Sequence, residues 1–208
     1  MHKKTAILIV CLLAPLLLTG FSQIRSQCNP PNLLNCFEAN LAGKNLAGKN
    51  LAGADMRGAN LSRANLRGAN LTGANLEKAN LRGANLSGAN LTGAYMSYAN
   101  FSSSKLIGSN LTEANAFMTN LSGTNLSSAN LRGAWLIAAN LEKANLKKAI
   151  LISSTLQRVY LFKAKLNGAD LSGADLMYAD LRGADVTGTN LTGTILFETI
   201  MPNGKRHE

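Results

Sequence analysis

The chain has 208 residues, and leucine (35), alanine (29) and asparagine (24) together make up 88 of them. This bias indicates an internal repeat, and a hydrophobic fraction of 46% excludes a disordered or collagen-like chain. Lysine and arginine outnumber aspartate and glutamate by 21 to 11, which gives a formal net charge of +10. What this charge implies depends on where the residues lie on the fold.

Residues 1–22 have the composition of a secretory signal peptide. Lys3 and Lys4 precede an uncharged apolar run, 5–18, and the small residues Gly20 and Ser22 follow it. The run is short for a membrane span, which needs about 20 apolar residues. We therefore expect export of the protein with cleavage after Ser22, or else after Gly20, and an uncleaved membrane anchor is the minor alternative.

Residues 23–38 precede the repeat and contain Cys28 and Cys36, the two cysteines that remain once 1–22 are removed. An even number of cysteines in an exported chain favours a disulfide between them. The alternative is a pair of free thiols in a loop. A bond would close a small loop and fix the structure at the start of the repeat.

Residues 39–201 repeat with a period of five and no insertion. A large apolar residue occupies nearly every fifth position from Leu41 to Met201, and leucine takes 27 of these 33 central sites. Only Ala116 leaves a size deficit at the centre. The residue two before the centre is alanine in 22 units, and the residue one before it is asparagine or aspartate in 24. Every glycine in 39–201 stands two residues after a centre.

A period of five matches neither regular element of secondary structure. In an α-helix, five residues turn by about 140°, so the leucines would spiral around the outside. In a flat strand they would alternate between the two faces. They share one interior only if the chain turns about every five residues, and asparagine, aspartate and glycine are residues that turns use. The sequence therefore predicts an all-β solenoid whose coils stack about 4.8 Å apart.

The unit resembles that of the pentapeptide-repeat family, Ala-(Asp/Asn)-Leu-X-X, as at 59–63 (Ala-Asn-Leu-Ser-Arg) and 169–173 (Ala-Asp-Leu-Ser-Gly). The resemblance implies a right-handed quadrilateral β-helix with four pentapeptides per coil, so 33 units would form about eight coils. In that fold the central residue and the small residue two before it point inward. The residue before the centre and the two after it face outward or lie at corners.

Both ends of such a rod would expose unpaired backbone and need covers. The segment 23–38 is the candidate N-terminal cap. Lys44 and Lys49 occupy inward sites, which predicts an irregular or frayed first coil. Pro202 is expected to stop the ladder at the other end, and the polar tail 202–208 is too short for the dimerisation helix that some family members carry.

The sequence argues against catalysis. The one histidine outside 1–22 is His207, in the tail, so no histidine base is available in the repeat. Asp170, Asp175, Asp180 and Asp185 resemble a carboxylate cluster, but four consecutive units of a quadrilateral coil face four different sides, so we interpret them as turn residues. No phosphate loop, metal-ligand spacing or dinucleotide fingerprint occurs. We predict no catalytic residue, no metal site and no cofactor.

Taking residue numbers modulo twenty maps the outer surface onto four sides. Six of the eight outward aromatic residues fall on the side whose centres run from Met56 to Leu196, where chance would put two. This predicts a long apolar stripe, and contiguous apolar surface tends to mark an interface. The alternatives are packing against another part of the chain, or isolated apolar residues without function. The predicted binding residues are Tyr95, Tyr98, Phe117, Met118, Trp135, Ile137, Tyr178 and Phe197.

Basic residues favour two adjoining sides, which hold ten of the fourteen outward lysines and arginines in regular units. A solvated face is the simplest interpretation. Binding to an anionic membrane surface or an acidic protein is the alternative, and export argues against nucleic acid. The candidate basic surface consists of Lys143, Lys147, Lys148, Lys163 and Lys165.

These observations predict an exported, non-catalytic scaffold that binds an unidentified protein partner, or a second copy, through its apolar side. No small-molecule substrate is expected. The family resemblance makes the periplasm or thylakoid lumen natural compartments, beside the extracellular space. One competing function is topoisomerase protection by DNA mimicry, which some family members perform, but positive charge and a signal peptide argue against it. Another is a membrane-anchored binder of anionic surfaces.

Overall fold

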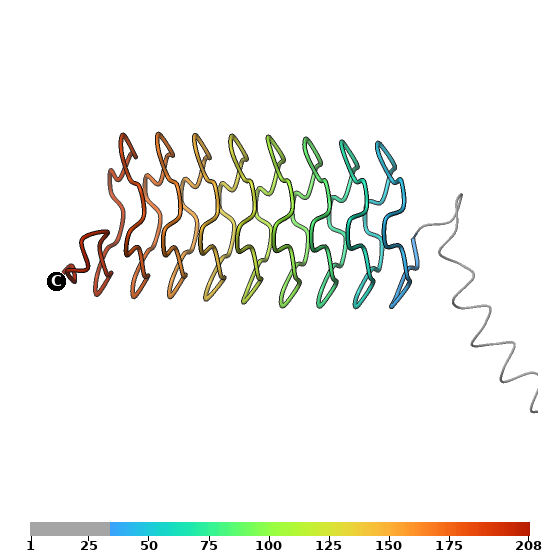
Figure 1. Ribbon diagram of the computed structural model, residues 1–208, viewed down its shortest axis with the longest axis horizontal. Helices are drawn as coiled ribbons and strands as arrows, with labels where there is room; N and C mark the ends of the chain where they lie inside the picture. Colours follow the sequence, from blue (N-terminus) through green and yellow to red (C-terminus); the bar gives the residue numbers. More distant parts are fainter. Residues whose placement is uncertain (1–33) are drawn as a thin grey trace, which may run out of the picture.

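The computed structural model describes residues 34–208, so the predicted signal peptide and most of the predicted cap lie outside the described residues. The described residues form a straight rod of stacked coils (Figure 1). Their regular structure consists of single-residue β-bridges at every fifth position, each separated from the next by a two-residue turn, rather than of helices or extended strands.

Each bridge along the rod joins, in parallel, two residues that lie twenty positions apart, from Asn35 with Asp55 to Asp180 with Ile200. The backbone supports this register on both sides of each bridge. The N–H of Leu61, for example, donates to the carbonyl of Asn80 at 2.7 Å, and the N–H of Asn80 donates to the carbonyl of Ala59 at 2.9 Å. One coil therefore holds four units and makes four turns, which confirms the predicted all-β solenoid.

The four sides of the rod are named here by their central residues. Side 1 contains Leu41, side 2 Leu46, side 3 Leu51 and side 4 Met56, and each continues in steps of twenty residues. Since four turns close one coil, sides 1 and 3 lie opposite each other, and so do sides 2 and 4. Side 4 is the one that the sequence predicts to be apolar.

Each turn is closed by a backbone hydrogen bond, such as that from the N–H of Ala64 to the carbonyl of Leu61 at 3.0 Å. The residue two after the centre has a positive φ, as the third residue of a type II turn requires. Glycine is common there because it adopts this conformation without steric cost, as at Gly83 (φ 68°). Sixteen other residues between 34 and 208 also adopt it, and none of them is β-branched.

The asparagine or aspartate before each centre binds the same turn. The Oδ1 atom of Asn60 accepts the backbone N–H of Ser62 at 3.2 Å, and this contact recurs along the rod. Some of these side chains also link coils, as when Asn65 donates from Nδ2 to Oδ1 of Asn45 at 3.0 Å. Asparagine and aspartate are thus preferred because their side-chain oxygen accepts the backbone N–H of the residue after the centre.

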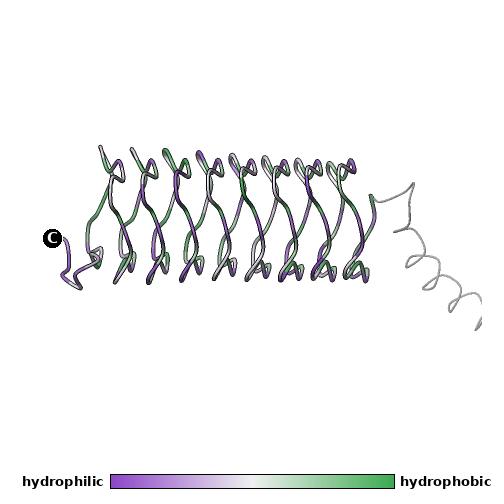
Figure 2. Cartoon of the chain, turned by 45° about the horizontal axis from the view of Figure 1, so that its top comes forward, coloured by the Kyte–Doolittle hydropathy of each residue, from purple (hydrophilic) through white to green (hydrophobic). Residues whose placement is uncertain are grey.

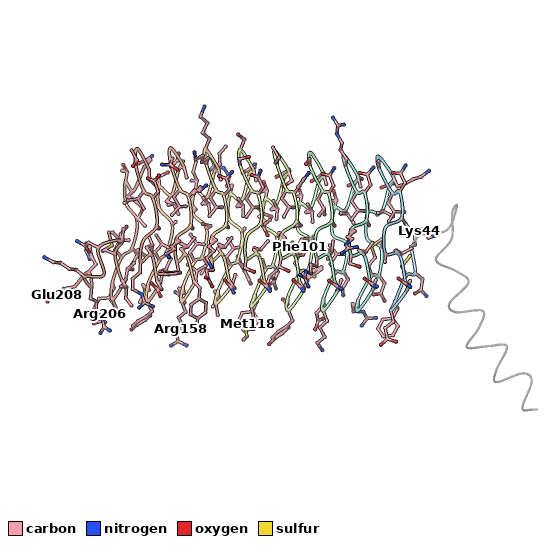
Figure 3. The ribbon with its side chains drawn as sticks, in the orientation of Figure 1. Lys44, Phe101, Met118, Arg158, Arg206 and Glu208 are labelled. Atoms are coloured by element: carbon pink, nitrogen blue, oxygen red, sulfur yellow. The ribbon has the colours of Figure 1, made fainter. Side chains whose placement is uncertain are left out.

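The core is a column of central residues and the small residues that precede them. Hydrophobic and hydrophilic residues alternate around every coil (Figure 2). The central residues from Leu51 to Leu181 are at most 2% exposed, and burial of each leucine contributes about 1.5–3 kcal/mol. Ala116 is buried like its larger equivalents, and the largest buried side chain, Phe101, lies inside the rod (Figure 3).

The ladder begins one unit before residue 39. Cys36 takes a central position at 1% exposure, and its neighbour Asn35 pairs with Asp55. The coil thus extends into the segment 23–38 that the sequence predicts as a cap. Cys28 lies outside the described residues, so the disulfide between it and Cys36 stays a prediction.

The predicted fraying at the first lysines is wrong. The backbone N–H groups of Asn65 and Asn70 donate to the carbonyls of Lys44 and Lys49 at 2.9 Å each, so the first coil pairs normally. Both lysine side chains are exposed. Lys44 lies at the N-terminal end of the rod (Figure 3), where no coil among the described residues stacks over it, so its long side chain can leave the core position.

The C-terminal tail covers part of the other end. Pro202 still accepts a ladder bond from Gly183 at 2.9 Å, after which the chain reverses and Arg206 pairs antiparallel with Ile200. The guanidinium of Arg206 also binds the Glu198 carboxylate at 2.7 Å. The central residues of the last coil stay only partly buried, because the tail is a single short segment.

Replacing Ser104 with alanine is expected to stabilise the rod by about 1 kcal/mol, because its buried hydroxyl finds no partner within the described residues. Ser109 occupies the equivalent inward position of the next unit, two residues before its centre. Its hydroxyl donates to the Leu106 carbonyl at 2.8 Å. Ser109→Ala should therefore destabilise by up to about 1 kcal/mol. Urea unfolding of both variants checks this difference, and shifts of the same sign would contradict it.

Candidate functional site

Side 4 presents three outward positions in each unit, namely the residue before the centre and the two residues after it. Parallel stacking aligns these positions in rows along the rod, with about 4.8 Å between neighbouring coils. Side chains that are twenty or more residues apart in sequence therefore lie next to each other. Met118 and Arg158 project from the same edge of the rod (Figure 3).

Three units that are neighbours along side 4 form an apolar surface that we call the middle patch. They are 94–98, 114–118 and 134–138. The rings of Tyr98 and Phe117 meet edge to face, with 5.6 Å between their centroids. Phe117 and Ile137 are half-buried, and Trp135 is the most exposed member at 59%. The middle patch consists of Tyr95, Tyr98, Phe117, Met118, Trp135 and Ile137.

A polar unit, 154–158, divides the predicted stripe in two. Gln157 donates from Nε2 to Oδ2 of Asp175 at 2.6 Å, and Arg158 places its guanidinium 5.7 Å from the Tyr178 ring centroid. Beyond it, the Tyr178 and Phe197 rings pack edge to face at 5.9 Å. The terminal patch, as we call it, consists of Met177, Tyr178, Ile195 and Phe197. The two patches share side 4 but do not form one continuous stripe.

Backbone conformation supplies a second signal on side 4, which the sequence interpretation missed. Half of the sixteen non-glycine residues with positive φ belong to this one side, where Gly58 is the one glycine at that position among the described units. On the other three sides glycine is common at this position. The scarcity of glycine at every twentieth position could have been read from the sequence. The residues are Glu38, Lys78, Tyr98, Met118, Ala138, Arg158, Tyr178 and Glu198.

The predicted basic residues are all exposed on sides 1 and 2. On side 1, Lys143 pairs with Glu142 at 3.0 Å, and the Lys163 ammonium lies 5.0 Å from the Phe162 ring centroid. Lys147, Lys148 and Lys165 lie on side 2. The structure therefore separates the basic candidates from the aromatic patches.

A shallow, open hollow lies on side 1. It contains Tyr160 and Phe162, the two outward aromatic residues that side 4 does not hold. Its acidic and basic groups neutralise each other, since Arg182 binds the Asp180 carboxylate at 2.6 Å. The hollow thus offers a contact surface rather than an enclosed reaction site.

The four aspartates of 170–185 lie on four different sides and bind different partners. Asp170 accepts the backbone N–H of Ser172 at 2.9 Å, and the Arg182 guanidinium binds Asp180. These contacts lower the pKa of both carboxyl groups. Within residues 34–208 no three histidine, cysteine or acidic side chains gather as a metal site would require. The positions and hydrogen bonds of the four aspartates agree with their interpretation as turn residues.

Asp185 is expected to make stability depend on pH in the acid range. Hydrogen bonds from the Asn167 amide, then from the hydroxyl and backbone N–H of Thr187, lower its pKa from 3.8 to about 2. These bonds favour the charged form, so their contribution is complete above the ordinary pKa and disappears as the pH falls through about 2. Asp185→Asn should flatten the loss of stability between about pH 4 and pH 2. Urea midpoints measured across this range check it, and an unchanged pH profile would contradict it.

No helix within 34–208 is long and apolar enough to cross a lipid bilayer. The regular coil, the buried leucine column and the decorated outer sides define a repeat protein of the β-solenoid class. A family model described as pentapeptide repeats matches in 8 copies, over residues 35–73, 74–113, 94–133, 118–151 and 154–193. The chain belongs to the pentapeptide-repeat family, whose fold is a right-handed quadrilateral β-helix.

Among solved structures, HetL is similar to this chain at 31% identity, covering 82% of this chain and 90% of its own, with a TM-score of 0.43. HetL is a pentapeptide repeat protein from the cyanobacterium Nostoc sp. strain PCC 7120, involved in heterocyst differentiation regulation. A thylakoid-lumen pentapeptide repeat protein of Arabidopsis thaliana is 34% identical over 51% of this chain and 71% of its own, with a TM-score of 0.40.

QnrB1, a plasmid-mediated fluoroquinolone resistance protein, is 19% identical over 76% of this chain and 81% of its own, with a TM-score of 0.56. At this identity the likeness shows the fold alone. No curated protein matches the sequence. Proteins of the family are generally non-catalytic structural or protein-binding proteins.

Proposed function

We propose that this protein is an exported, non-catalytic scaffold of about eight coils that binds a protein partner, or a second copy of itself, through side 4. Export rests on the signal-peptide composition of 1–22, and the compartment is the periplasm, the thylakoid lumen or the extracellular space. In an oxidising compartment, Cys28 and Cys36 form a disulfide at the start of the rod.

The observation that carries this proposal is the replacement of glycine on side 4. A residue other than glycine in the left-handed conformation costs about 1 kcal/mol. The rod accepts this cost eight times on one side, where Tyr98, Met118 and Tyr178 gain outward positions for large apolar side chains. Stability of the backbone alone favours glycine at these sites, and contacts made by the side chains of Tyr98, Met118 and Tyr178 would offset the cost at those three positions.

The composition of the middle patch fits a protein interface. Tyrosine, tryptophan and methionine are enriched at interface centres, where they bring large contact areas at small entropic cost. Exposed fractions of 55% for Tyr95, 48% for Met118 and 59% for Trp135 leave these side chains free to bury more surface. The stacked coils hold them rigidly, so binding would require little ordering of the backbone.

Topoisomerase protection by DNA mimicry is the alternative, and the charge disfavours it. A DNA mimic presents rows of negative charge, whereas the chain carries 21 basic and 11 acidic residues. Five of the eleven acidic groups are held in turn hydrogen bonds, namely Asp55, Asp170, Asp175, Asp180 and Asp185. The second alternative, a membrane-anchored binder of anionic surfaces, requires that 1–22 be retained.

Proximity labelling in an exporting host, combined with N-terminal sequencing of the mature protein, tests export and partner binding together. The double variant Phe117→Ser, Trp135→Ser should lose the neighbours of the wild-type protein, or its self-association in sedimentation. Ile150→Ser with Ile152→Ser removes matched apolar surface from side 3 and should keep them. Identical profiles for all three proteins would overturn the role of side 4.

A further inference from the structure

Side 2, opposite the aromatic side, carries a strong excess of positive charge. Its outward positions hold five basic residues and one acidic residue, Asp185. Side 4, by contrast, holds five acidic and three basic residues between 34 and 198. The net charge of the rod thus changes from positive on side 2 to negative on side 4. The basic residues of side 2 are Arg67, Lys105, Lys147, Lys148 and Lys165.

These cations form no close ion pair with the acidic groups of residues 34–208. Five ion pairs occur in residues 34–208, and none of them involves a basic residue of side 2. Asp185, the one acidic group on this side, accepts hydrogen bonds from Asn167 and Thr187, and it attracts Lys147 without forming an ion pair with it. The positive potential of side 2 is therefore available to an external anion.

The shape of side 2 favours an extended surface over a discrete ligand. Glycine and serine occupy most of the positions two residues after its centres. The longer lysine side chains therefore extend beyond their small neighbours. The hollow that contains Tyr160 and Phe162 and a second one beside Arg63 and Arg82 both lie on side 1. Four of the five cations are lysines, which act as point charges, whereas bidentate phosphate recognition prefers arginine.

The chemistry of side 2 also distinguishes between anionic partners. Single-stranded nucleic acid needs aromatic stacking platforms, and the outward positions of side 2 contain no aromatic residue. A protein interface needs an apolar centre, and side 2 offers only Ile107. An anionic bilayer requires neither of these features, since each lysine near its surface contributes by charge alone.

We propose that side 2 is a membrane-docking face that lays the rod flat on a bilayer rich in anionic phospholipid. Because side 4 lies opposite, docking turns the aromatic patches away from the lipid. The proposal does not depend on the partner-binding role of side 4. It needs no retained N-terminal anchor, because the attraction comes from residues 67–165.

Co-sedimentation with lipid vesicles of the protein purified from the exporting host, with the N-terminus that it has there, tests this proposal. Vesicles with about one third phosphatidylglycerol should bind the protein, pure phosphatidylcholine vesicles should not, and salt at about 0.5 M should release it. The triple variant Lys147→Gln, Lys148→Gln, Lys165→Gln should lower the partition coefficient by about 100-fold, since each charge contributes about fivefold. Both proteins carry the same N-terminus, so any contribution from residues 1–22 cancels.

A matched control removes the same net charge from sides 3 and 4 through Lys78→Gln, Arg132→Gln and Arg158→Gln. This variant should lose less than about threefold in partition, because its cations do not face the lipid. Equal losses in the two variants would show a dependence on net charge alone and overturn the docking face. Binding to polyglutamate but not to anionic vesicles would overturn the proposal in favour of an acidic protein. Circular dichroism checks that both variants are folded.

Discussion

Replacing Leu126 with alanine is expected to destabilise the rod by about 2–5 kcal/mol. Leu126 is fully buried in the middle of the rod, and the central residues Leu106 and Leu146 of the adjacent coils lie on either side of it. Truncation would leave a cavity that the paired backbone cannot close, because each coil is hydrogen-bonded to both neighbours. Urea unfolding, followed by circular dichroism, measures the loss.

Leu191→Ala provides the matched control for this result. Leu191 occupies the same kind of central site in the last coil, where it is only partly buried. Within residues 34–208 no further coil packs over it, so its truncation leaves a solvent-open notch and should cost less than half as much. Equal losses at the two sites would contradict the model of a core whose packing strengthens toward the middle.

Replacing Trp135 with alanine is expected to weaken partner binding or self-association by about 2–4 kcal/mol, which is a factor of about 30 to 1,000 in Kd. Trp135 is the most exposed aromatic residue of side 4, and it lies between the other apolar residues of the middle patch and the polar unit 154–158. Large aromatic side chains near the centre of an interface supply most of its binding free energy. Calorimetry with the captured partner measures the effect.

Tyr178→Ala tests whether the two patches act as one. Arg158 and Phe197 already contact the Tyr178 ring, so part of its surface is covered in the free protein. We expect a loss of less than about 1 kcal/mol, because the polar unit separates it from the middle patch. A loss equal to that of Trp135→Ala would contradict the division and indicate a single interface along side 4.

Much of this architecture could be predicted from the sequence, because the regular repeat fixes which residues lie next to each other in space. Asn60 binds its own turn, Leu61 points inward, and the residue twenty positions later lies in the next coil. With no insertion to break the frame, the same rule brings Tyr98 against Phe117 although they are far apart in sequence. Side, orientation and approximate exposure were therefore accessible without coordinates.

The remainder depends on what happens where the repeat ends or where side chains interact. Fraying at Lys44 was a wrong prediction because the rule for inward positions assumes a coil on both sides, and the first coil has none before it among the described residues. The reversal that pairs Arg206 with Ile200 lies outside the periodic sequence. The interruption by Gln157 and Arg158 was visible as composition, but its contacts with Asp175 and Tyr178 required side-chain geometry.

The uniform register between coils also limits how this chain can change in length. Adding or removing twenty residues would lengthen or shorten the rod by one coil and keep every side chain on its side. A gain of five residues, however, would rotate everything after it by a quarter turn, because each unit contributes one of four corners. Such an insertion near residue 150 would carry Tyr178 and Phe197 to a neighbouring face, and it would move Lys165 away from Lys147. The aromatic and cationic faces therefore persist only if insertions and deletions in the repeat are multiples of twenty residues.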